Sequence, residues 1–183
     1  RWDSFVARLP AGVQLLSLFQ RNPPLLDRVA GVLGAAPVLA DYLARTPSAL
    51  EGLLDPVADP DFGRILRMRL GDARALEDAI GIIRRTVREE EFSIAVATME
   101  GRMDTDTAGL ARSALAEAAL ASLLPLVLED FARRFGKVRG GGMAVVVMGK
   151  AGGREMMAGS DLDMMLVYDH PEGVIQSTAR APA

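Results

Sequence analysis

The sequence contains no cysteine and a single histidine, His170. Without cysteine the chain forms no disulfide bond and offers no thiolate to a zinc ion. One histidine also excludes a metal site built from a pair of histidines, and the loop composition around His170 predicts a solvated position. The lack of cysteine is compatible with a reducing cytoplasm, which is the location that we expect.

A large excess of charge of one sign is also missing. The 183 residues carry 21 Lys and Arg against 24 Asp and Glu, for a formal net charge of −3. This charge is small and of the wrong sign for a nucleic-acid-binding surface, so we expect no nucleic acid partner. With half of its residues hydrophobic and a quarter charged, the chain has the composition of an ordinary globular protein.

Apolar runs long enough to cross a membrane are lacking as well. The longest apolar stretch, Ser113 to Leu128, is interrupted by Glu117 and Pro125 and is shorter than the ~20 residues that a membrane span needs. It predicts a core helix, and we expect no membrane partner. The sequence begins with Arg1 without a signal-peptide pattern, so we expect an internal part of a longer protein.

Helical periodicity dominates the chain up to about residue 135. Prolines divide residues 11–54 into short helices, after an expected short helix over residues 1–9, and two Asp-Pro pairs in residues 55–60 predict a turn-rich joint. Longer helices are predicted over residues 62–70, about 74–99 and about 105–135, where Gly136 ends the last one. Apolar stripes at helical spacing predict core positions at Leu25, Leu26, Val29, Val32, Leu33, Val38, Leu39, Tyr42 and Leu43, and at Leu76, Ile80, Ile83 and Val87.

The stretch from Met143 to Asp169 reads as strand, turn and strand. Met143 to Met148 is a short valine-rich run that Gly149 breaks, and Met164 to Tyr168 is a second apolar run. Glycines in the turn, among them Gly152 and Gly153, let backbone N–H groups approach an anion. Lys150 and Arg154 add positive charge there, so the turn predicts a phosphate site.

Two carboxylates, Asp161 and Asp163, flank Leu162 at the expected start of the second strand. Alternate residues of a strand point to one side, with Cα atoms roughly 7 Å apart. At about 6 Å and an effective dielectric near 20 the two charges repel by on the order of 3 kcal/mol, which a divalent cation would reverse. An all-oxygen ligand set favours Mg²⁺ or Mn²⁺. The pair therefore predicts a metal-assisted nucleotide-transfer site.

Two other phosphate-binding motifs do not match these residues. A dinucleotide-binding turn requires G-x-G-x-x-G and a crossover helix, both of which are missing. A Walker phosphate loop requires G-x-x-x-x-G-K-[ST], but Lys150 precedes the later glycines. A bare D-x-D can also be a solvated strand edge or a pair of turn caps.

Together these residues resemble a known family. A strand, a glycine turn and D-h-D on the next strand resemble the polymerase-β-like nucleotidyltransferases. The sequence motif GKAGGREMMAGSDLD, from Gly149 to Asp163, is similar to the signature of the bacterial glutamine synthetase adenylyltransferases. Residues 25–56 are similar to the linker ahead of that family's second catalytic domain. The superfamily's Gly-Ser or Gly-Gly pair matches either Gly149-Lys150 or Gly152-Gly153.

The resemblance implies a mainly α chain, with a helical domain over residues 1–135 and the first strands of an α/β polymerase-β-like nucleotidyltransferase domain over residues 136–183. It implies a third metal-binding carboxylate on a later strand, so we expect residues 1–183 alone to be inactive. The implied reaction is transfer of AMP from ATP to a tyrosine of glutamine synthetase, regulating nitrogen assimilation, with AMP removal in the family's other catalytic domain.

The same resemblance implies the residue roles and the partners. Asp161 and Asp163 would hold Mg²⁺ or Mn²⁺, and Ser160 would brace the turn. The ATP triphosphate would contact Gly149, Lys150, Gly152, Gly153 and Arg154. The partners would be glutamine synthetase and a PII-type signalling protein. A different class of function stays open, in which the helices form a non-catalytic binding or regulatory module of the same enzyme.

Overall fold

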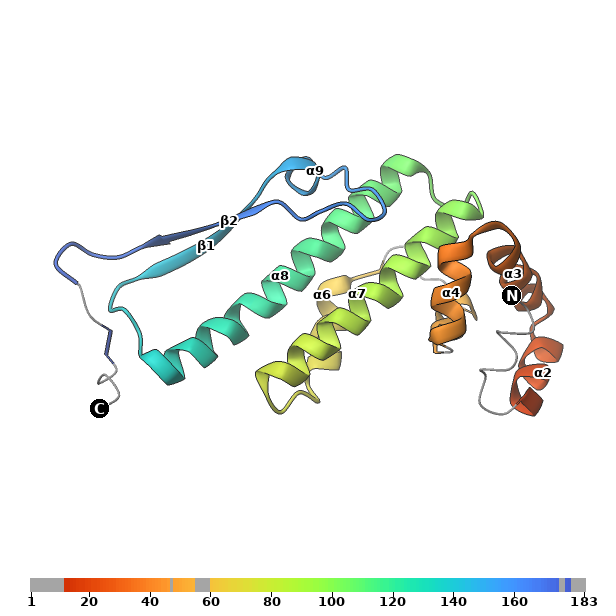
Figure 1. Ribbon diagram of the computed structural model, residues 1–183, viewed down its shortest axis with the longest axis horizontal. Coiled ribbons are helices and arrows are strands. Elements are labelled where there is room, and N and C mark those ends of the chain that lie inside the picture. The colour runs from red at the N-terminus through yellow and green to blue at the C-terminus, as the bar shows by residue number, and fades with distance from the viewer. Residues whose placement is uncertain (1–11, 47, 55–59, 175–176, 179–183) are drawn as a thin grey trace. The chain divides into compact units, whose positions relative to one another are not determined.

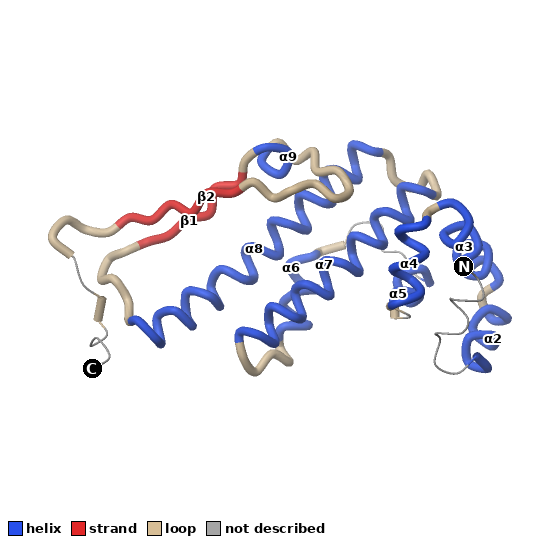
Figure 2. Tube along the Cα trace, in the orientation of Figure 1, coloured by secondary structure: helices blue, strands red, loops and turns tan. Residues whose placement is uncertain are grey.

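The computed structural model describes residues 12–46, 48–54, 60–174 and 177–178. The predicted helix over residues 1–9 and most of the Asp-Pro joint lie outside these ranges. Most of the described residues are helical, and the rest of their regular structure is an antiparallel sheet of two strands; Figure 1 labels these elements and Figure 2 colours them by type. The mainly α class is confirmed, whereas the nucleotidyltransferase fold stays a prediction.

Four short helices come first: α2 (Gly12–Arg21), α3 (Pro23–Ala35), α4 (Pro37–Arg45) and α5 (Ala49–Leu54). Proline stands at the start of both α3 and α4. Its fixed φ suits the first helical turn, where its missing N–H would have no intrahelical partner. The predicted division of this region at prolines is therefore confirmed for α3 and α4.

Three further helices follow: α6 (Phe62–Leu70) and the two longest helices, α7 (Leu76–Met99) and α8 (Thr105–Phe135). The Asp61 carboxylate caps α6 by accepting the Arg64 N–H at 2.8 Å. Helix α8 continues through Pro125. It ends as predicted at Gly136, which has a φ of 78° and donates its N–H to the Ala132 carbonyl at 2.9 Å.

The sheet consists of β1 (Gly142–Val147) and β2 (Met164–Asp169), which pair antiparallel from Gly142↔Asp169 to Val147↔Met164. The short helix α9 (Gly149–Gly152) follows β1. One prediction is corrected here, because Asp161 and Asp163 lie in the loop before β2 and not on the strand. Next to the strands, the Met148 N–H donates a hydrogen bond to the Asp163 carbonyl at 2.8 Å. The regular strand pairing itself begins at Met164.

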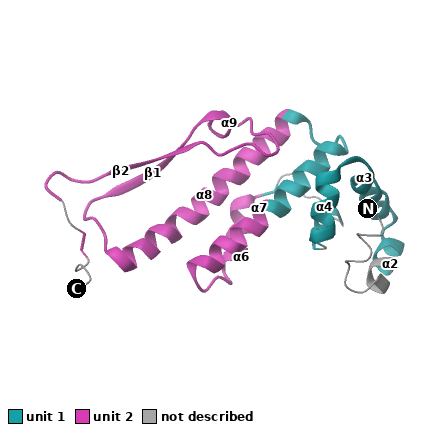
Figure 3. Ribbon diagram, viewed as in Figure 1, with its two compact units in different colours: residues 1–60, 88–105 teal, residues 61–87, 106–183 magenta. Residues whose placement is uncertain are grey.

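The chain forms two compact units (Figure 3), residues 1–60 with 88–105 and residues 61–87 with 106–183. Helix α7 contributes residues 76–87 to the second unit and 88–99 to the first. The predicted division into domains 1–135 and 136–183 follows the resemblance, not packing, and stays a prediction.

The core of the first unit contains most of the predicted apolar stripes of α3 and α4, packed with Phe92 and Val96 of α7. The Tyr42 and Phe92 rings lie 5.2 Å apart, a contact of the kind that stabilises cores. Two predicted core residues are corrected, since Leu26 is 39% exposed and Val38 is 81% exposed. Each α-helix turns only one face inward, and Leu25 and Leu39 take the inward positions beside them.

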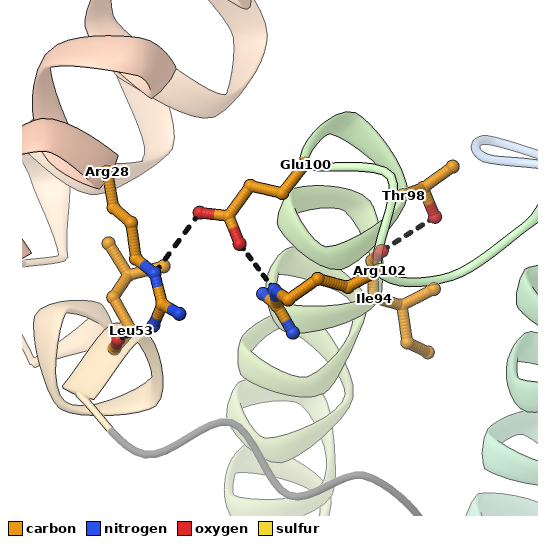
Figure 4. Close-up of polar contacts among 6 residues, drawn as sticks. All are labelled: Arg28, Leu53, Ile94, Thr98, Glu100 and Arg102. Carbon is orange, nitrogen blue, oxygen red and sulfur yellow. Dashed lines mark hydrogen bonds and ion pairs between the residues drawn. The ribbon is translucent and has the colours of Figure 1, made fainter. Parts of the chain in front are cut away.

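A polar cluster joins three elements of this unit (Figure 4). Glu100, just after α7, accepts from Arg102 Nε at 2.5 Å and pairs with Arg28 Nε of α3 at 3.4 Å. Arg28 also donates through Nη1 to the Leu53 carbonyl of α5 at 2.6 Å. The Glu100 side chain is only 18% exposed, so this charge is held largely out of water between two arginines.

In the second unit the buried face of α7 differs from the predicted one. Ala79, Ile83 and Thr86 are buried, whereas Ile80 is 37% exposed. Leu76 and Val87 are half-buried. Thr86 accepts a hydrogen bond from Arg69 Nη1 of α6 at 3.0 Å, which satisfies its buried hydroxyl. The inward face therefore includes a small and a polar residue, which an apolar pattern does not register.

Helix α8 lies beside the sheet, and an apolar groove of about 280 Å³ separates them. Its lining residues come from α8, β1 and β2: Leu120, Leu123, Leu124, Val127, Leu128, Phe131, Met143, Val145, Met164 and Leu166. Phe131 is 57% exposed and Phe135 is 49% exposed. Only part of the surface of α8 is therefore buried, whereas the sequence predicts a core helix. The expectation that no stretch is long enough to cross a membrane is corrected, because α8 as a whole is long and apolar enough by length and composition alone, a property that core helices share.

Candidate functional site

The glycine turn after β1 is closed by its own backbone. The N–H groups of Gly152 and Gly153 donate to the carbonyls of Met148 and Gly149 at 3.1 and 2.9 Å. Those of Arg154 and Glu155 donate to Ala151 and Lys150 at 3.2 and 2.9 Å. The sequence offers two candidates for the phosphate-binding pair, Gly149-Lys150 and Gly152-Gly153. The N–H groups of Gly152-Gly153 already form hydrogen bonds within the turn.

Gly149 brings the turn and the carboxylates together. Its φ is 57°, and a Cβ at this position would lie 2.7 Å from Oδ2 of Asp163. A side chain here would therefore meet both backbone strain and the carboxylate. Gly152 is restricted for a different reason, since its Cβ would lie 2.7 Å from the Val147 carbonyl oxygen. Both glycines allow the close approach on which the site depends.

The carboxylate segment follows a second tight turn. The Ser160 hydroxyl accepts the Met157 N–H at 3.0 Å, and the Ser160 N–H donates to the Met157 carbonyl at 3.1 Å. Ser160 thereby closes the turn directly before Asp161. Asp161 and Asp163 are exposed and Leu162 is half-buried between them. This is the inward and outward alternation expected of the D-h-D pattern, although the segment precedes the strand.

The two predicted phosphate cations have partners within the second unit. Lys150 is exposed, and its Nζ lies 3.8 Å from Sδ of Met157. Arg154 has a φ of 59°, and its Nη2 lies 3.0 Å from Oε2 of Glu117 on α8. His170 is exposed, as predicted, beside the Pro171 carbonyl.

The donor chemistry of the carboxylate segment fits Mg²⁺ or Mn²⁺. Within the part of the chain that the structure describes, no group of three or more Asp, Glu or His residues could hold a metal ion. Mg²⁺ usually takes one or two carboxylates and completes its shell with water and substrate phosphates. Asp161 and Asp163 are both exposed, and Asp163 lies beside the glycine turn at Gly149; two such carboxylates would suffice for that ligand set.

The sequence analysis missed the contribution of α8 to this region. Gly109, Ser113 and Glu117 contact the segment from Arg154 to Met156. Their spacing of four residues places them on one side of the helix, but an apolar pattern, which predicts only a packing helix, does not include them. Nothing in the local pattern of residues 105–135 indicates which distant segment they contact.

Comparison with known proteins identifies relatives along almost the whole chain. The family model described as glutamate-ammonia ligase adenylyltransferase matches residues 26–181. Three relatives are each named bifunctional glutamine synthetase adenylyltransferase/adenylyl-removing enzyme. They come from Mesorhizobium japonicum (40% identical), Brucella suis (39%) and Rhizobium meliloti (36%). Each match covers 100% of this chain and 19% of the relative, so the chain spans about a fifth of the relatives' length. The chain belongs to the glutamate-ammonia ligase adenylyltransferase family.

Proposed function

We propose that the protein carrying this sequence transfers AMP from ATP to a tyrosine hydroxyl of glutamine synthetase, and that residues 149–163 form part of the active site. The names of the relatives support the reaction class. The structural observation that supports the location is the contact of the Asp163 carboxylate with Gly149, where a Cβ would be 2.7 Å away. It brings a phosphate-binding type of turn and a metal-binding type of carboxylate to one place.

The residues divide into four roles in this proposal. Asp161 and Asp163 would hold Mg²⁺ or Mn²⁺, which when bound neutralises charge on the ATP phosphates. Lys150 and Arg154, with the backbone of Gly149 and Lys150, would bind the triphosphate. Gly152 and Gly153 shape the turn, because their N–H groups already donate to Met148 and Gly149. Ser160 orients the carboxylate segment through its two bonds to Met157.

The chemistry is a phosphoryl displacement. The tyrosine oxygen forms a bond to the α-phosphorus of ATP, the bond from that phosphorus to the bridging oxygen of the β-phosphate breaks, and pyrophosphate leaves with the electron pair. The tyrosine proton is lost to solvent or a base. Such reactions depend chiefly on positioning and charge stabilisation, which is why exposed cations and carboxylates around a rigid turn suit the task.

We further propose, from the resemblance, that this stretch belongs to the adenylyl-transferring half of the enzyme. In this proposal β1 and β2 are the first strands of its polymerase-β-like domain. A PII-type signalling protein would be a regulatory partner, and the cytoplasm the location. The net charge of −3 argues against a nucleic acid substrate.

The decisive variant replaces both Asp161 and Asp163 by asparagine in the full-length protein that carries this sequence. We expect loss of Mg²⁺-dependent AMP transfer to glutamine synthetase to below a few per cent, because the ligand pair loses its charge. Folding should be unchanged, since both side chains are exposed. Asp169→Asn, an exposed aspartate at the far end of β2, is the matched control and should keep full activity. Transfer by the double variant comparable to wild type would refute the site.

A second candidate is a non-catalytic helical binding or regulatory module of the same enzyme. The observation that favours it is the predominance of helix, with only two strands in the described part of the chain. Calorimetric titration of ATP with and without Mg²⁺ separates the two functions. A catalytic site would bind ATP in a Mg²⁺-dependent manner, and the Asp161→Asn, Asp163→Asn variant would abolish that binding. A binding module would show no such binding.

A further inference from the structure

One face of α8 contacts the glycine turn at three successive helical positions. Gly109, Ser113 and Glu117 are spaced by four residues, so they lie on one side of the helix. They meet Glu155, Met156 and Arg154 respectively. These three residues follow the glycines of the turn, and they begin with Arg154, the last of the proposed phosphate-binding residues before the carboxylates.

The first two contacts are close and buried. A Cβ at Gly109 would lie 3.3 Å from the Glu155 Cα, so the glycine allows the turn to approach the helix. The Ser113 side chain is buried, donates to the Gly109 carbonyl at 2.9 Å and lies 3.5 Å from the Met156 N–H. Met156 itself is 9% exposed. The turn therefore packs against α8 through backbone atoms and small side chains.

The third contact involves a proposed substrate-binding residue. Arg154 is the only non-glycine residue with a positive φ in the described part of the chain, and its guanidinium reaches Glu117 at 3.0 Å. The arginine presents five N–H donors in a planar fork. The contact with Glu117 is made through Nη2, and the remaining edge of the fork can donate to a phosphate.

We propose that Glu117 is a positioning residue that orients Arg154 toward the ATP phosphates, with Gly109 and Ser113 holding the turn on the same helix. This inference rests on the proposed function. Both side chains of the pair are more than 60% exposed. A pair of this kind changes an equilibrium constant by no more than about fivefold, so Glu117 tunes nucleotide affinity and takes no part in bond formation.

The test is a double-mutant cycle in the full-length protein, with Glu117→Gln, Arg154→Ala and both together. Glu129→Gln is the matched control, because Glu129 is an exposed glutamate on the same helix. Measurements are the Kd of ATP in excess Mg²⁺ by calorimetry, and KM and kcat of AMP transfer. We expect Glu117→Gln to raise Kd and KM by about two- to fivefold with kcat unchanged. Arg154→Ala should raise both further, and the double variant should match Arg154→Ala.

Two results would overturn the positioning role. One is additive effects of Glu117→Gln and Arg154→Ala, which would show that the residues act separately. The other is an unchanged or lower Kd in Glu117→Gln, which would make Glu117 irrelevant or a competitor of phosphate. If either result accompanies an inactive Asp161→Asn, Asp163→Asn variant, the proposed function stands and only the positioning role fails. Full transfer by that aspartate variant would overturn the proposed function itself.

Discussion

Gly149 is the single residue on which the geometry of the candidate site depends most directly. It combines a φ of 57° with a distance of only 2.7 Å between the place that a Cβ would occupy and Asp163 Oδ2. We expect Gly149→Ala to lower AMP transfer by about 100-fold, because a small displacement of a carboxylate is costly for positioned chemistry. Gly101→Ala is the control, since Gly101 has a φ of 70° with nothing within 4 Å. A kinetic assay in which both variants lose activity equally would contradict the clash.

Gly31 of α3 permits the opposite kind of prediction. It is an exposed helical glycine, and a Cβ there would meet nothing within 4 Å. Gly31→Ala should raise the free energy of unfolding by about 0.5–1 kcal/mol, because alanine loses less backbone entropy in a helix. Gly109→Ala is the comparison, since its Cβ would press on the Glu155 backbone at 3.3 Å. Urea denaturation of both variants should show a gain only for Gly31→Ala.

At the scale of elements, the Glu100 cluster holds α3, α5 and the end of α7 together. Glu100→Gln should lower the free energy of unfolding by about 1–2 kcal/mol, because it leaves Arg28 and Arg102 without a carboxylate in a largely desolvated place. The control is Asp41→Asn. The Asp41–Arg45 pair is 3.8 Å long with both side chains over 70% exposed, so its loss should change stability by less than about 0.5 kcal/mol. Equal effects in denaturation experiments would show that burial does not decide the difference.

At the scale of the whole molecule, burial is unevenly distributed between the helices and the sheet. Val29 and Val32 of α3 are fully buried, whereas all six residues of β2 are exposed. A two-stranded sheet with so little cover is marginally stable. In the 183-residue chain we expect the β1 and β2 amides to exchange with solvent at least about 100-fold faster than those in the middle of α3. Hydrogen exchange read by NMR tests this, and equal protection of strands and helix would contradict it.

Much of the local structure could be predicted from the residues themselves. The proline-started helices α3 and α4, the end of α8 at Gly136 and the two strands around the glycine turn all lie where local patterns placed them. These features depend on backbone preferences of neighbouring residues, which the sequence shows directly. The motif from Gly149 to Asp163 likewise indicated the family, which the comparisons confirm.

Contacts between distant segments were decided only by the tertiary structure. Which side of α7 is buried depends on packing within the second unit. Thr86 is therefore buried, whereas Ile80, which the apolar pattern predicts as a core residue, is 37% exposed. The pairing of Arg154 with Glu117 joins residues that are 37 positions apart, and no local pattern specifies such a partner. Periodicity predicts that a helix has an inward face, but the elements that pack on that face determine its direction and the residues of the turn that it supports.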